Sequence, residues 1–355
     1  MTDLYIGIMS GTSLDGIDAG LFSFADHQCI THATHSAPFD VNTASLLKSF
    51  ARGGELSAAD IGCLDSALGA AYAAAATSLL SKTNANVVAI GCHGQTVWHQ
   101  PSGPHAFTWQ LGDPHRLVET TGVTTVADFR RADVAAGGQG APLAPLFHRW
   151  LWPKKNAAVV NIGGISNITP LRGASGFDCG PGNTLMDAWA RQHLGKAYDE
   201  SGDWALSGQV IPRLLATMQN DEYFLAKAPK STGPEHFNLL WLDTALAGST
   251  HLPADVQATL LELTAWCIAE AVNQSGAQGA VICGGGTYNL ALMARLTALC
   301  KVTVEGSGQH GLDPQWVEAA CFAWLAKQAV NGEKVDTRVI TGARHPVRLG
   351  VIFPA

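Results

Sequence analysis

The chain has 355 residues, a length that predicts two domains rather than a single core. Hydrophobic residues make up 47% and charged residues 14%, which excludes a disordered chain and indicates a globular protein with a large buried area. The net charge of −7, without a block of basic residues, argues against nucleic acid as a partner.

The sequence also bears on where the protein works. It starts without a basic and then apolar leader, and no apolar run reaches the length that spans a membrane. The eight cysteines are scattered without a Cys-x-x-Cys pair, so a structural zinc site is not expected. We therefore expect reduced thiols in a cytoplasmic protein that has no membrane partner.

Short apolar runs that end in glycine clusters alternate with helical patterns, which is typical of an α/β fold. The predicted strands are Leu4–Met9, Ile17–Phe24, Val87–Ile90, Thr124–Ala127, Ala157–Ile162, Ser166–Leu171 and Gly279–Cys283. The predicted helices are Ser57–Ser81, Thr184–His193, Pro253–Ser275, Leu290–Leu299 and Pro314–Val330. Apolar residues recur at helical spacing in the third of these helices and predict one buried stripe, formed by Val256, Leu260, Leu263, Cys267 and Ala271.

The segment Gly7–Asp18 is the most informative feature of the chain. An apolar run ends here in a turn of small residues, and a second apolar run begins at Ile17, so the pattern predicts a β-hairpin. Backbone N–H groups and hydroxyls in such a loop can hold a phosphate, and the carboxylate of Asp15 can hold its Mg²⁺. An ordinary surface turn explains the same residues equally well, so the rest of the chain has to decide.

Two further glycine loops, Asn161–Asn167 and Cys283–Asn289, each follow a predicted strand. Their glycines allow a close approach of the backbone to an anion, and the second loop offers a flat surface for a base or a ribose. A helix that begins near Tyr288 would add a favourable N-terminal dipole. A plain turn is the simpler interpretation of any one loop, but three such loops together favour nucleotide binding.

Competing nucleotide motifs are weaker. The sequence has no G-x-x-x-x-G-K-[ST] loop, which excludes a P-loop protein. Gly306–Gly311 matches the dinucleotide fingerprint, but too little chain follows for a complete βαβ unit, so we treat the match as chance. The next helix has its own start signal, Asp313 followed by Pro314.

A weak internal repeat indicates how the chain is organised. The runs that begin at Tyr5 and at Val159 both break into a small-residue turn and resume as a strand, which suggests two related α/β domains. The polar, glycine-rich segment after residue 128 places the boundary there. We expect an N-terminal domain over 1–128 and a C-terminal domain over 129–340. The tail 341–355 has an apolar end that can pack on either domain, and we assign it to the first.

The order of the three loops and the hairpin repeat resemble the superfamily of acetate and sugar kinases, Hsp70 chaperones and actin. More closely, the sequence is similar to the anhydro-N-acetylmuramic acid kinase family from residue 5 to the C-terminus. The segments that carry this resemblance are Gly7–Asp18, Gly91–His99, Ala127–Arg131, Gly137–Leu143, Asn161–Asn167, Gly176–Asn183, Lys230–Gly233 and Cys283–Gly286. The resemblance implies two actin-like (ribonuclease H-like) domains that flank a nucleotide cleft.

The resemblance also implies a reaction. Members of the family take 1,6-anhydro-N-acetylmuramic acid, ATP and water, open the anhydro bridge, and phosphorylate O6 to give N-acetylmuramic acid 6-phosphate and ADP. They recycle bacterial cell-wall sugar in the cytoplasm, are typically dimers and require Mg²⁺. Two alternatives stay open: an ordinary sugar or acid kinase that adds phosphate without water, and an ATPase of the chaperone or actin type.

Asp178 is the candidate base that activates water. It lies in what the sequence indicates is a rigid turn ahead of a helix, and it matches the catalytic aspartate of the family. An Asx-turn or a helix cap is the commoner use of an aspartate beside glycine and proline. Asp187 is the competing carboxylate, but it lies inside the predicted helix and is expected to be structural.

The resemblance assigns the ATP phosphates to the first loop and the adenosine to the third. Asp15 is the expected Mg²⁺ partner, through water. Many members of the wider superfamily carry aspartate where this chain has Asn161, which makes a metal role for Asn161 doubtful. The expected nucleotide-binding residues are Gly11, Thr12, Ser13, Leu14, Asp15, Gly16, Ile17, Asp18, Gly163, Gly164, Gly284, Gly285, Gly286 and Asn289.

Four residues are candidates for binding the sugar. Arg130 and Arg131 can clamp the lactyl carboxylate of the substrate, although a solvated or interdomain ion pair is an equal alternative for either one. His93 follows a strand and lines the sugar site unless it is a hydrogen-bonded loop histidine. Glu318 is the weaker candidate, because an exposed helix glutamate is the simpler interpretation.

Overall fold

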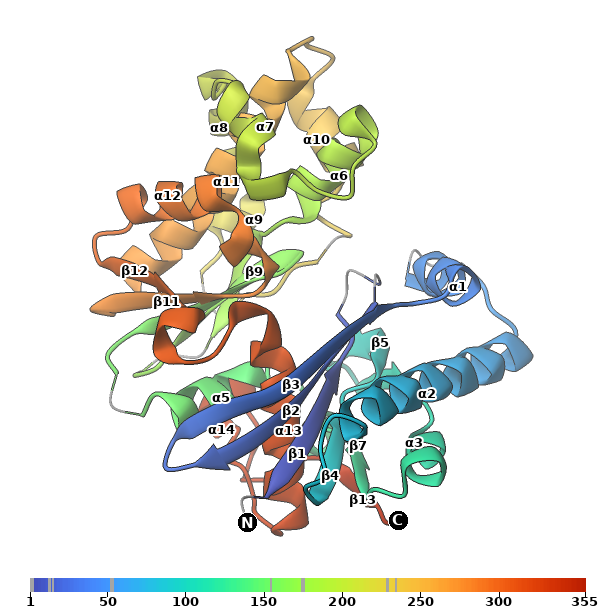
Figure 1. Ribbon diagram of the computed structural model, residues 1–355. Coiled ribbons are helices and arrows are strands. Elements are labelled where there is room, and N and C mark those ends of the chain that lie inside the picture. Colours follow the sequence, from blue (N-terminus) through green and yellow to red (C-terminus); the bar gives the residue numbers. More distant parts are fainter. Residues whose placement is uncertain are drawn as a thin grey trace. The chain divides into compact units, whose positions relative to one another are not determined.

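The structure is a computed structural model that describes residues 3–11, 14, 16–51, 54–153, 155–173, 176–227, 230–233 and 235–355. The chain divides into two compact units. Unit 1 comprises residues 1–153 and 316–355, and unit 2 comprises residues 154–315. Each unit has its own sheet and its own covering helices (Figure 1).

Unit 1 contains a six-stranded sheet in the order β13-β7-β4-β1-β2-β3. The strands are β1 Leu4–Met9, β2 Gly16–Ala25, β3 Gln28–Pro38, β4 Val87–Cys92, β7 Thr125–Ala127 and β13 Val351–Phe353. Strands β1, β2 and β3 pair antiparallel, whereas β4 lies parallel to both β1 and β7. Strands β5 (Gln95–Gln100) and β6 (Phe107–Leu111) form a separate two-stranded ribbon.

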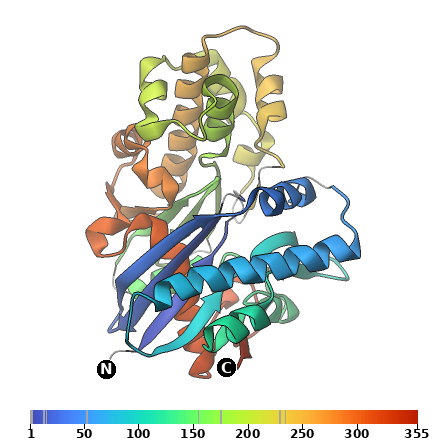
Figure 2. The same ribbon diagram turned by 45° about the vertical axis from the view of Figure 1, so that its right-hand side comes forward.

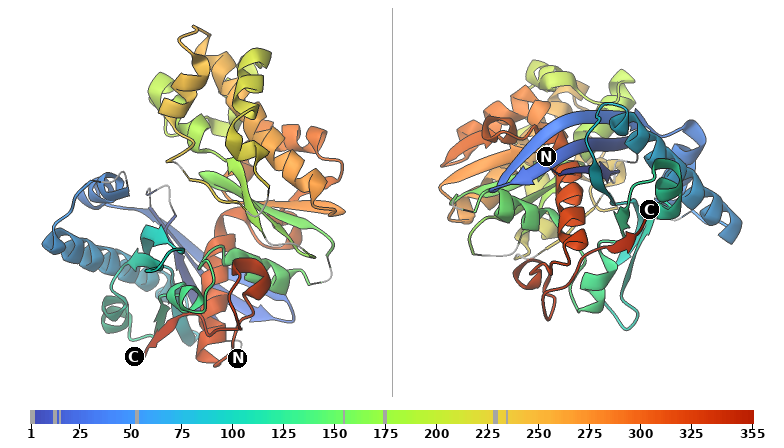
Figure 3. Two further views of the ribbon diagram at one scale, coloured as in Figure 1. Left: turned by 180° about the vertical axis from the view of Figure 1, so that it is seen from behind. Right: turned by 60° about the horizontal axis from the view of Figure 1, so that its bottom comes forward.

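Two long helices cover the sheet of unit 1. Helix α2 (Ala58–Leu80) lies across the sheet in Figure 2, and α13 (Val317–Val330) lies over it when the molecule is seen from behind in Figure 3. Gly7 and Gly91 explain the close packing of α13, because a Cβ at either position would collide with the carbonyl oxygen of Ala319 or Phe322. The glycine that opens the first motif is therefore needed for helix packing.

Helix α2 is long and apolar enough, by length and composition, to cross a membrane, whereas we expected no such run. A core helix passes the same test, and α2 packs as one. Its side chains Leu64, Leu68 and Tyr72 are fully buried in the core of unit 1, beside Ile6 and Ile8 of β1.

Unit 2 contains a five-stranded sheet in the order β10-β9-β8-β11-β12. The strands are β8 Ala158–Ile162, β9 Ile165–Pro170, β10 Phe177–Pro181, β11 Gly279–Cys283 and β12 Thr303–Gly306. Helix α11 (Pro253–Gln274) packs against β9 and β10. The predicted apolar stripe of this helix is buried, and so are polar residues around it, such as Gln257 and Thr264, because α11 is enclosed on most of its faces.

The two sheets share one topology. In each, the first strand is central, the second and third pair antiparallel on one side, and the fourth and fifth pair parallel on the other. The first two strands of each sheet are the two predicted hairpins. This repeated order defines the ribonuclease H-like (actin-like) class of α/β domain, and it confirms the fold class expected from the sequence.

The boundaries of the units differ from those expected. The segment after residue 128 stays in unit 1, because the buried carboxylate of Asp133 accepts hydrogen bonds from the Gly140 amide and the Thr341 hydroxyl. Residues 316–340, expected in the second domain, also belong to unit 1, where α13 packs on β1 and β4. The tail lies in unit 1 as well, and its strand β13 pairs with β7.

The remaining helices are shorter. Those of unit 1 are α1 Val41–Ala51, α3 Pro114–Thr121, α4 Arg131–Ala135, α5 Ala144–Leu151 and α14 Arg338–Thr341. Those of unit 2 are α6 Thr184–Leu194, α7 Asp203–Ser207, α8 Pro212–Gln219, α9 Glu222–Leu225, α10 Leu239–Leu246 and α12 Leu290–Leu299. Asp313-Pro314 begins a 3₁₀ turn over Pro314–Trp316, and α13 starts only at Val317.

Candidate functional site

The first loop joins β1 to β2, with Met9 paired to Asp18. The side chains of Leu14 and Ile17 are buried in the core, so only their backbone is available to a ligand. Gly16 packs against Ala37 of β3, and Asp18 accepts a hydrogen bond from Ser36 at 2.5 Å. Thr12, Ser13 and Asp15 lie outside the described residues, and their expected roles stay predictions.

Buried polar contacts hold the start of this loop. The Ser10 hydroxyl lies 2.7 Å from the Tyr72 hydroxyl, and the Gln95 side-chain amide donates to the Gly11 carbonyl at 3.2 Å. Ser10 and Gln95 are almost fully buried. Neither residue was among the predicted site residues, although Ser10 lies in the family segment Gly7–Asp18 and Gln95 in Gly91–His99.

The second and third loops meet in unit 2. Strands β8 and β11 are parallel and place Asn161 beside Cys283, so both loops leave the same edge of the sheet. A Cβ at Gly284 or at Gly286 would collide with the main chain or side chains of residues 161–162. These two glycines allow the loops to pack together.

Three other glycines of these loops, Gly163, Gly164 and Gly285, have room where a side chain would be. A Cβ at Gly163, Gly164 or Gly285 would meet its nearest atom at 3.6 Å, 4.0 Å and 4.0 Å, respectively. The exposed glycine at 285 and the half-exposed pair at 163–164 therefore offer bare backbone that a nucleotide can approach closely. The described residues fit a phosphate or ribose contact of this kind.

The helix expected near Tyr288 is α12, which has the predicted bounds Leu290–Leu299, and a 3₁₀ turn over Gly285–Tyr288 precedes it. The Asn289 side chain caps α12, because its Oδ1 accepts from the Leu292 amide at 3.0 Å. One backbone donor of the helix end is thus already satisfied, and the Asn289 oxygen is engaged in the cap.

His93, Arg130 and Glu318 come together in unit 1. His93 is buried, and its Nε2 accepts from Arg130 Nε at 3.0 Å, while Arg130 Nη1 donates to the Gly140 carbonyl at 2.8 Å. Burial and the Arg130 charge hold the pKa of His93 well below its usual range, so the ring is neutral. Its protonated Nδ1 has no partner among the residues the structure describes.

Glu318 acts electrostatically on this cluster. It lies in the first turn of α13 and is half-buried, in contrast to the exposed glutamate that was the simpler interpretation. Burial raises the pKa of its carboxyl group, and the charge of Arg130 opposes that shift. The cluster therefore combines a guanidinium, a carboxylate and a buried neutral imidazole.

The Arg131 side chain does not share the contacts of Arg130. Its side chain is exposed and lies 3.6 Å from the Asp128 carboxylate, and its Nε donates to the Thr108 carbonyl at 3.4 Å. The structure thus separates two arginines that the sequence treats alike.

Asp178 lies on the edge strand β10 of unit 2, not in the turn that the sequence indicated. A bulge between Asp178 and Gly180 bends this strand. The Asp178 Oδ2 accepts from the Thr232 amide at 3.0 Å, its own amide donates to the Lys230 carbonyl at 3.0 Å, and its carbonyl accepts from the Tyr223 hydroxyl at 2.5 Å.

Burial raises the pKa of Asp178 from 3.8 to about 6, since the Thr232 amide opposes the shift only in part and the Glu235 charge adds to it. A carboxyl group with such a pKa can exchange protons near neutral pH. The competing Asp187 lies in the first turn of α6, where a carboxylate stabilises the helix dipole.

Within the described part of the chain, no group of three or more His, Cys, Asp or Glu side chains could hold a metal ion. Mg²⁺ commonly keeps several waters and binds through one or two carboxylates and substrate phosphates. The structure therefore leaves Mg²⁺ as a prediction that depends on Asp15 and a bound nucleotide.

The repeated ribonuclease H-like topology and the glycine loops define the class of protein to which the chain belongs, the actin-like α/β proteins. Solved structures that align with the chain include the ADPNP-bound activator of the 2-hydroxyisocaproyl-CoA dehydratase from Clostridium difficile, with a TM-score of 0.49 and 10% identity over 94% of this chain and 99% of that one. A ROK family glucokinase from Streptomyces griseus aligns with a TM-score of 0.42 and 14% identity over 92% and 99%.

Sequence comparisons identify the family. The family model described as anhydro-N-acetylmuramic acid kinase matches residues 3–355. Relatives of that name are 47% identical in Xylella fastidiosa, over 99% of this chain and 96% of the relative, and 46% identical in Pasteurella multocida, over 99% and 97%. The chain therefore belongs to the anhydro-N-acetylmuramic acid kinase family, as the sequence motifs predicted, and is a kinase.

Proposed function

We propose that the protein cleaves the 1,6-anhydro bond of 1,6-anhydro-N-acetylmuramic acid with water and phosphorylates O6 with ATP. The products are N-acetylmuramic acid 6-phosphate and ADP. The family match along the chain supports the substrate. The observation that carries the chemistry is Asp178, a half-buried carboxylate whose pKa is raised to about 6.

Asp178 is the proposed base. As the carboxylate, it removes a proton from water while the water oxygen bonds to the anomeric carbon and the C1–O6 bond breaks. O6 then accepts the γ-phosphoryl group, and ADP leaves. The Thr232 amide fixes one Asp178 oxygen, which orients the carboxylate for this task.

ATP supplies the phosphoryl group, and Mg²⁺ neutralises charge on its phosphates. We assign the phosphates to the backbone of residues 11–18, with Asp15 as the Mg²⁺ partner through water. In unit 2, the open faces of Gly163, Gly164 and Gly285 are assigned to the nucleotide. The packing roles of Gly284 and Gly286 place them behind that surface, and Asn289 caps α12.

The cluster in unit 1 is the proposed sugar site. The lactyl carboxylate of the substrate is the proposed partner of Arg130, whose Nε and Nη1 are held by His93 and Gly140 and whose Nη2 bonds to none of the described residues. The Glu318 carboxylate is the proposed acceptor for sugar hydroxyl or amide groups, and the buried His93 ring is assigned the role of holding Arg130. Arg131, which lies with Asp128, is assigned no contact with the sugar.

The cellular setting belongs to the same proposal. On the strength of the family resemblance, we place the enzyme in the cytoplasm as a homodimer that returns cell-wall sugar to metabolism.

One incubation tests the reaction. Purified full-length protein is mixed with 1,6-anhydro-N-acetylmuramic acid and Mg-ATP, and the products are weighed by mass spectrometry, with a sugar-free incubation as control. The proposal predicts a sugar product heavier by one water and one phosphoryl group. A product heavier by the phosphoryl group alone would indicate an ordinary sugar kinase, and the absence of any sugar phosphate would contradict the proposal.

A further inference from the structure

The 221–241 segment of unit 2 surrounds Asp178. We use this name for described residues 221–227, 230–233 and 235–241. Among the described residues outside the β ladder, Asp178 accepts hydrogen bonds from Tyr223 and Thr232 and donates one to Lys230, all three in this segment. The position of the Asp178 carboxylate therefore depends on how the segment itself is held.

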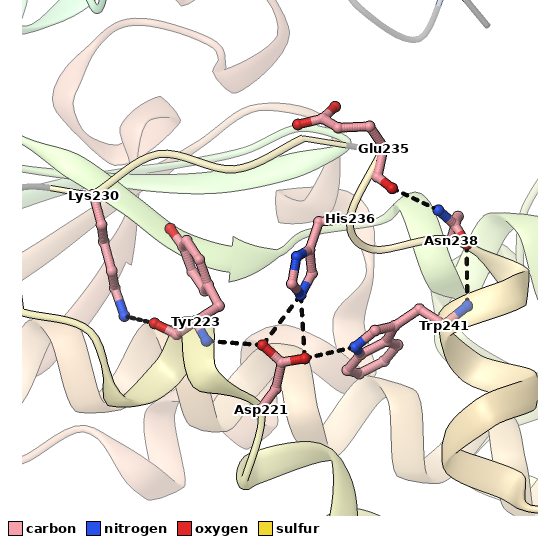
Figure 4. Close-up of polar contacts among 7 residues, drawn as sticks. All are labelled: Asp221, Tyr223, Lys230, Glu235, His236, Asn238 and Trp241. Carbon is pink, nitrogen blue, oxygen red and sulfur yellow. Dashed lines mark hydrogen bonds and ion pairs between the residues drawn. The ribbon is translucent and has the colours of Figure 1, made fainter.

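A single carboxylate ties the segment together (Figure 4). The Asp221 Oδ1 accepts from the Tyr223 amide at 2.8 Å and from His236 Nε2 at 3.1 Å. Its Oδ2 accepts from Trp241 Nε1 at 2.8 Å and lies 3.2 Å from the same His236 nitrogen. Asp221 thus connects the start of α9, the loop at His236 and the first turn of α10.

The connection continues to the residues that contact Asp178. The Lys230 ammonium donates to the Tyr223 carbonyl at 2.7 Å and lies 4.4 Å from the centre of the Tyr223 ring. Tyr223 is therefore held through its amide by Asp221 and through its carbonyl by Lys230. Its hydroxyl then donates to the Asp178 carbonyl.

The surroundings of Asp221 suit a fixed anchor. Its side chain is 16% exposed, whereas that of His236 is 39% exposed. Burial raises the pKa of Asp221, but the hydrogen bonds from Trp241, Tyr223 and His236 outweigh burial and lower it. A carboxylate with this many donors stays ionised and keeps its place.

We infer that Asp221 is a positioning residue for Asp178, an inference that rests on the proposed role of Asp178 as the base. Asp221 does not touch the substrate in this account. It fixes the segment from which Tyr223, Lys230 and Thr232 hold the reactive carboxylate.

A double-mutant cycle tests the inference. Asp221→Asn replaces one acceptor oxygen with a donor, so we expect kcat to fall about 10-fold while KM for ATP changes less than about twofold. In an Asp178→Asn background the base is already absent, so its position no longer matters. Adding Asp221→Asn to that protein should change the residual turnover by less than about twofold. Asp243→Asn, the same change at an exposed position of α10, is the matched control and leaves kcat unchanged.

The outcomes separate the two proposals. An equal fall in kcat in both backgrounds, or no fall in either, overturns the positioning role and leaves the base intact. Near-normal turnover by Asp178→Asn alone instead overturns the base. If Asp221→Asn fails to fold by circular dichroism, Trp241→Phe, which removes only the indole donor, replaces it in the same cycle with an expected fall of about threefold.

If residual turnover of the Asp178→Asn protein is too slow to measure, the acid limb of the kcat profile decides. Loosening the Thr232 amide removes a bond that lowers the Asp178 pKa. The Asp221 variant should therefore show its acid midpoint about half a pH unit higher than the parent. A midpoint that stays in place or falls contradicts the inference.

Discussion

Asp178 and Asp221 are carboxylates of the same unit, and their surroundings shift their pKa values in opposite directions. Among the residues that the structure describes, the Asp178 side chain accepts one hydrogen bond, from the Thr232 amide, and burial raises its pKa to about 6. Asp221 accepts from an amide, an imidazole and an indole, and its pKa is lowered. Asp178 is the more deeply buried of the two and has the fewer donors, so burial and the supply of donors together decide which carboxylate stays available for proton transfer.

The largest expected effect follows from removing the available carboxylate. Asp178→Asn keeps the acceptor for the Thr232 amide but cannot take a proton, so kcat should fall about 10³-fold. The affinity for an ATP analogue, measured by calorimetry, should stay within about twofold of the parent. If Asp178→Asn turned over at close to the rate of the parent, Asp178 would not be the base.

Stability should change in the opposite direction to activity. Because the folded pKa of Asp178 is raised from 3.8 to about 6, ionisation disfavours the folded state; this cost is absent at low pH and complete above pH 6. Asp178→Asn removes the charge, so its free energy of unfolding should exceed that of the parent by up to about 3 kcal/mol at pH 8 and about half that at pH 5.

Urea unfolding at the two pH values measures this difference, with Asp243→Asn as the control that shows no change between them. Asp221, whose pKa is lowered, should behave in the reverse way: its ionised form contributes stability that is lost as the pH falls. If the Asp178→Asn protein were less stable than the parent at pH 8, burial would not disfavour the ionised form of Asp178 in the folded state.

The smallest effect extends the comparison to unit 1, where the two adjacent arginines differ in the same way. Arg130→Lys keeps the charge but loses the planar fork, so KM for the anhydrosugar should rise about 10- to 30-fold. Arg131→Lys, the same substitution at the exposed position, should change that KM less than about threefold. Steady-state kinetics with both variants measure the contrast, and equal effects would remove the assignment of the substrate carboxylate to Arg130.

Part of this account could be predicted from the sequence. Both hairpins were predicted because their apolar runs and small-residue turns are local patterns, and β1 and β11 have the predicted bounds. Strand β10 was missed because Gly180 and Pro181 are typical of a turn, whereas here they end a bulged edge strand. Strand β3 was missed because its exposed positions make the sequence largely polar.

Other features could not be predicted because they depend on contacts between residues far apart in the sequence. The compact unit does not end at residue 128, where we expected a boundary, because the Asp133 carboxylate accepts a hydrogen bond from Thr341, 208 positions further along the chain. Glu318 was taken as the weakest sugar candidate because its electrostatic coupling to Arg130 depends on the return of α13 to unit 1. The Asp221–His236 pair forms no motif, since only the fold of the 221–241 segment brings the two side chains together.

The central claim is that water attacks the sugar while O6 receives the phosphoryl group, and oxygen labelling tests it most directly. The reaction is run briefly in H₂¹⁸O and quenched, and the mass of the sugar product is measured by mass spectrometry before and after removal of the phosphate. Unlabelled N-acetylmuramic acid 6-phosphate in the same water is the control for exchange. The account predicts one ¹⁸O atom in the sugar and none in the transferred phosphoryl group. An unlabelled sugar, or ¹⁸O in the phosphoryl group, would contradict it.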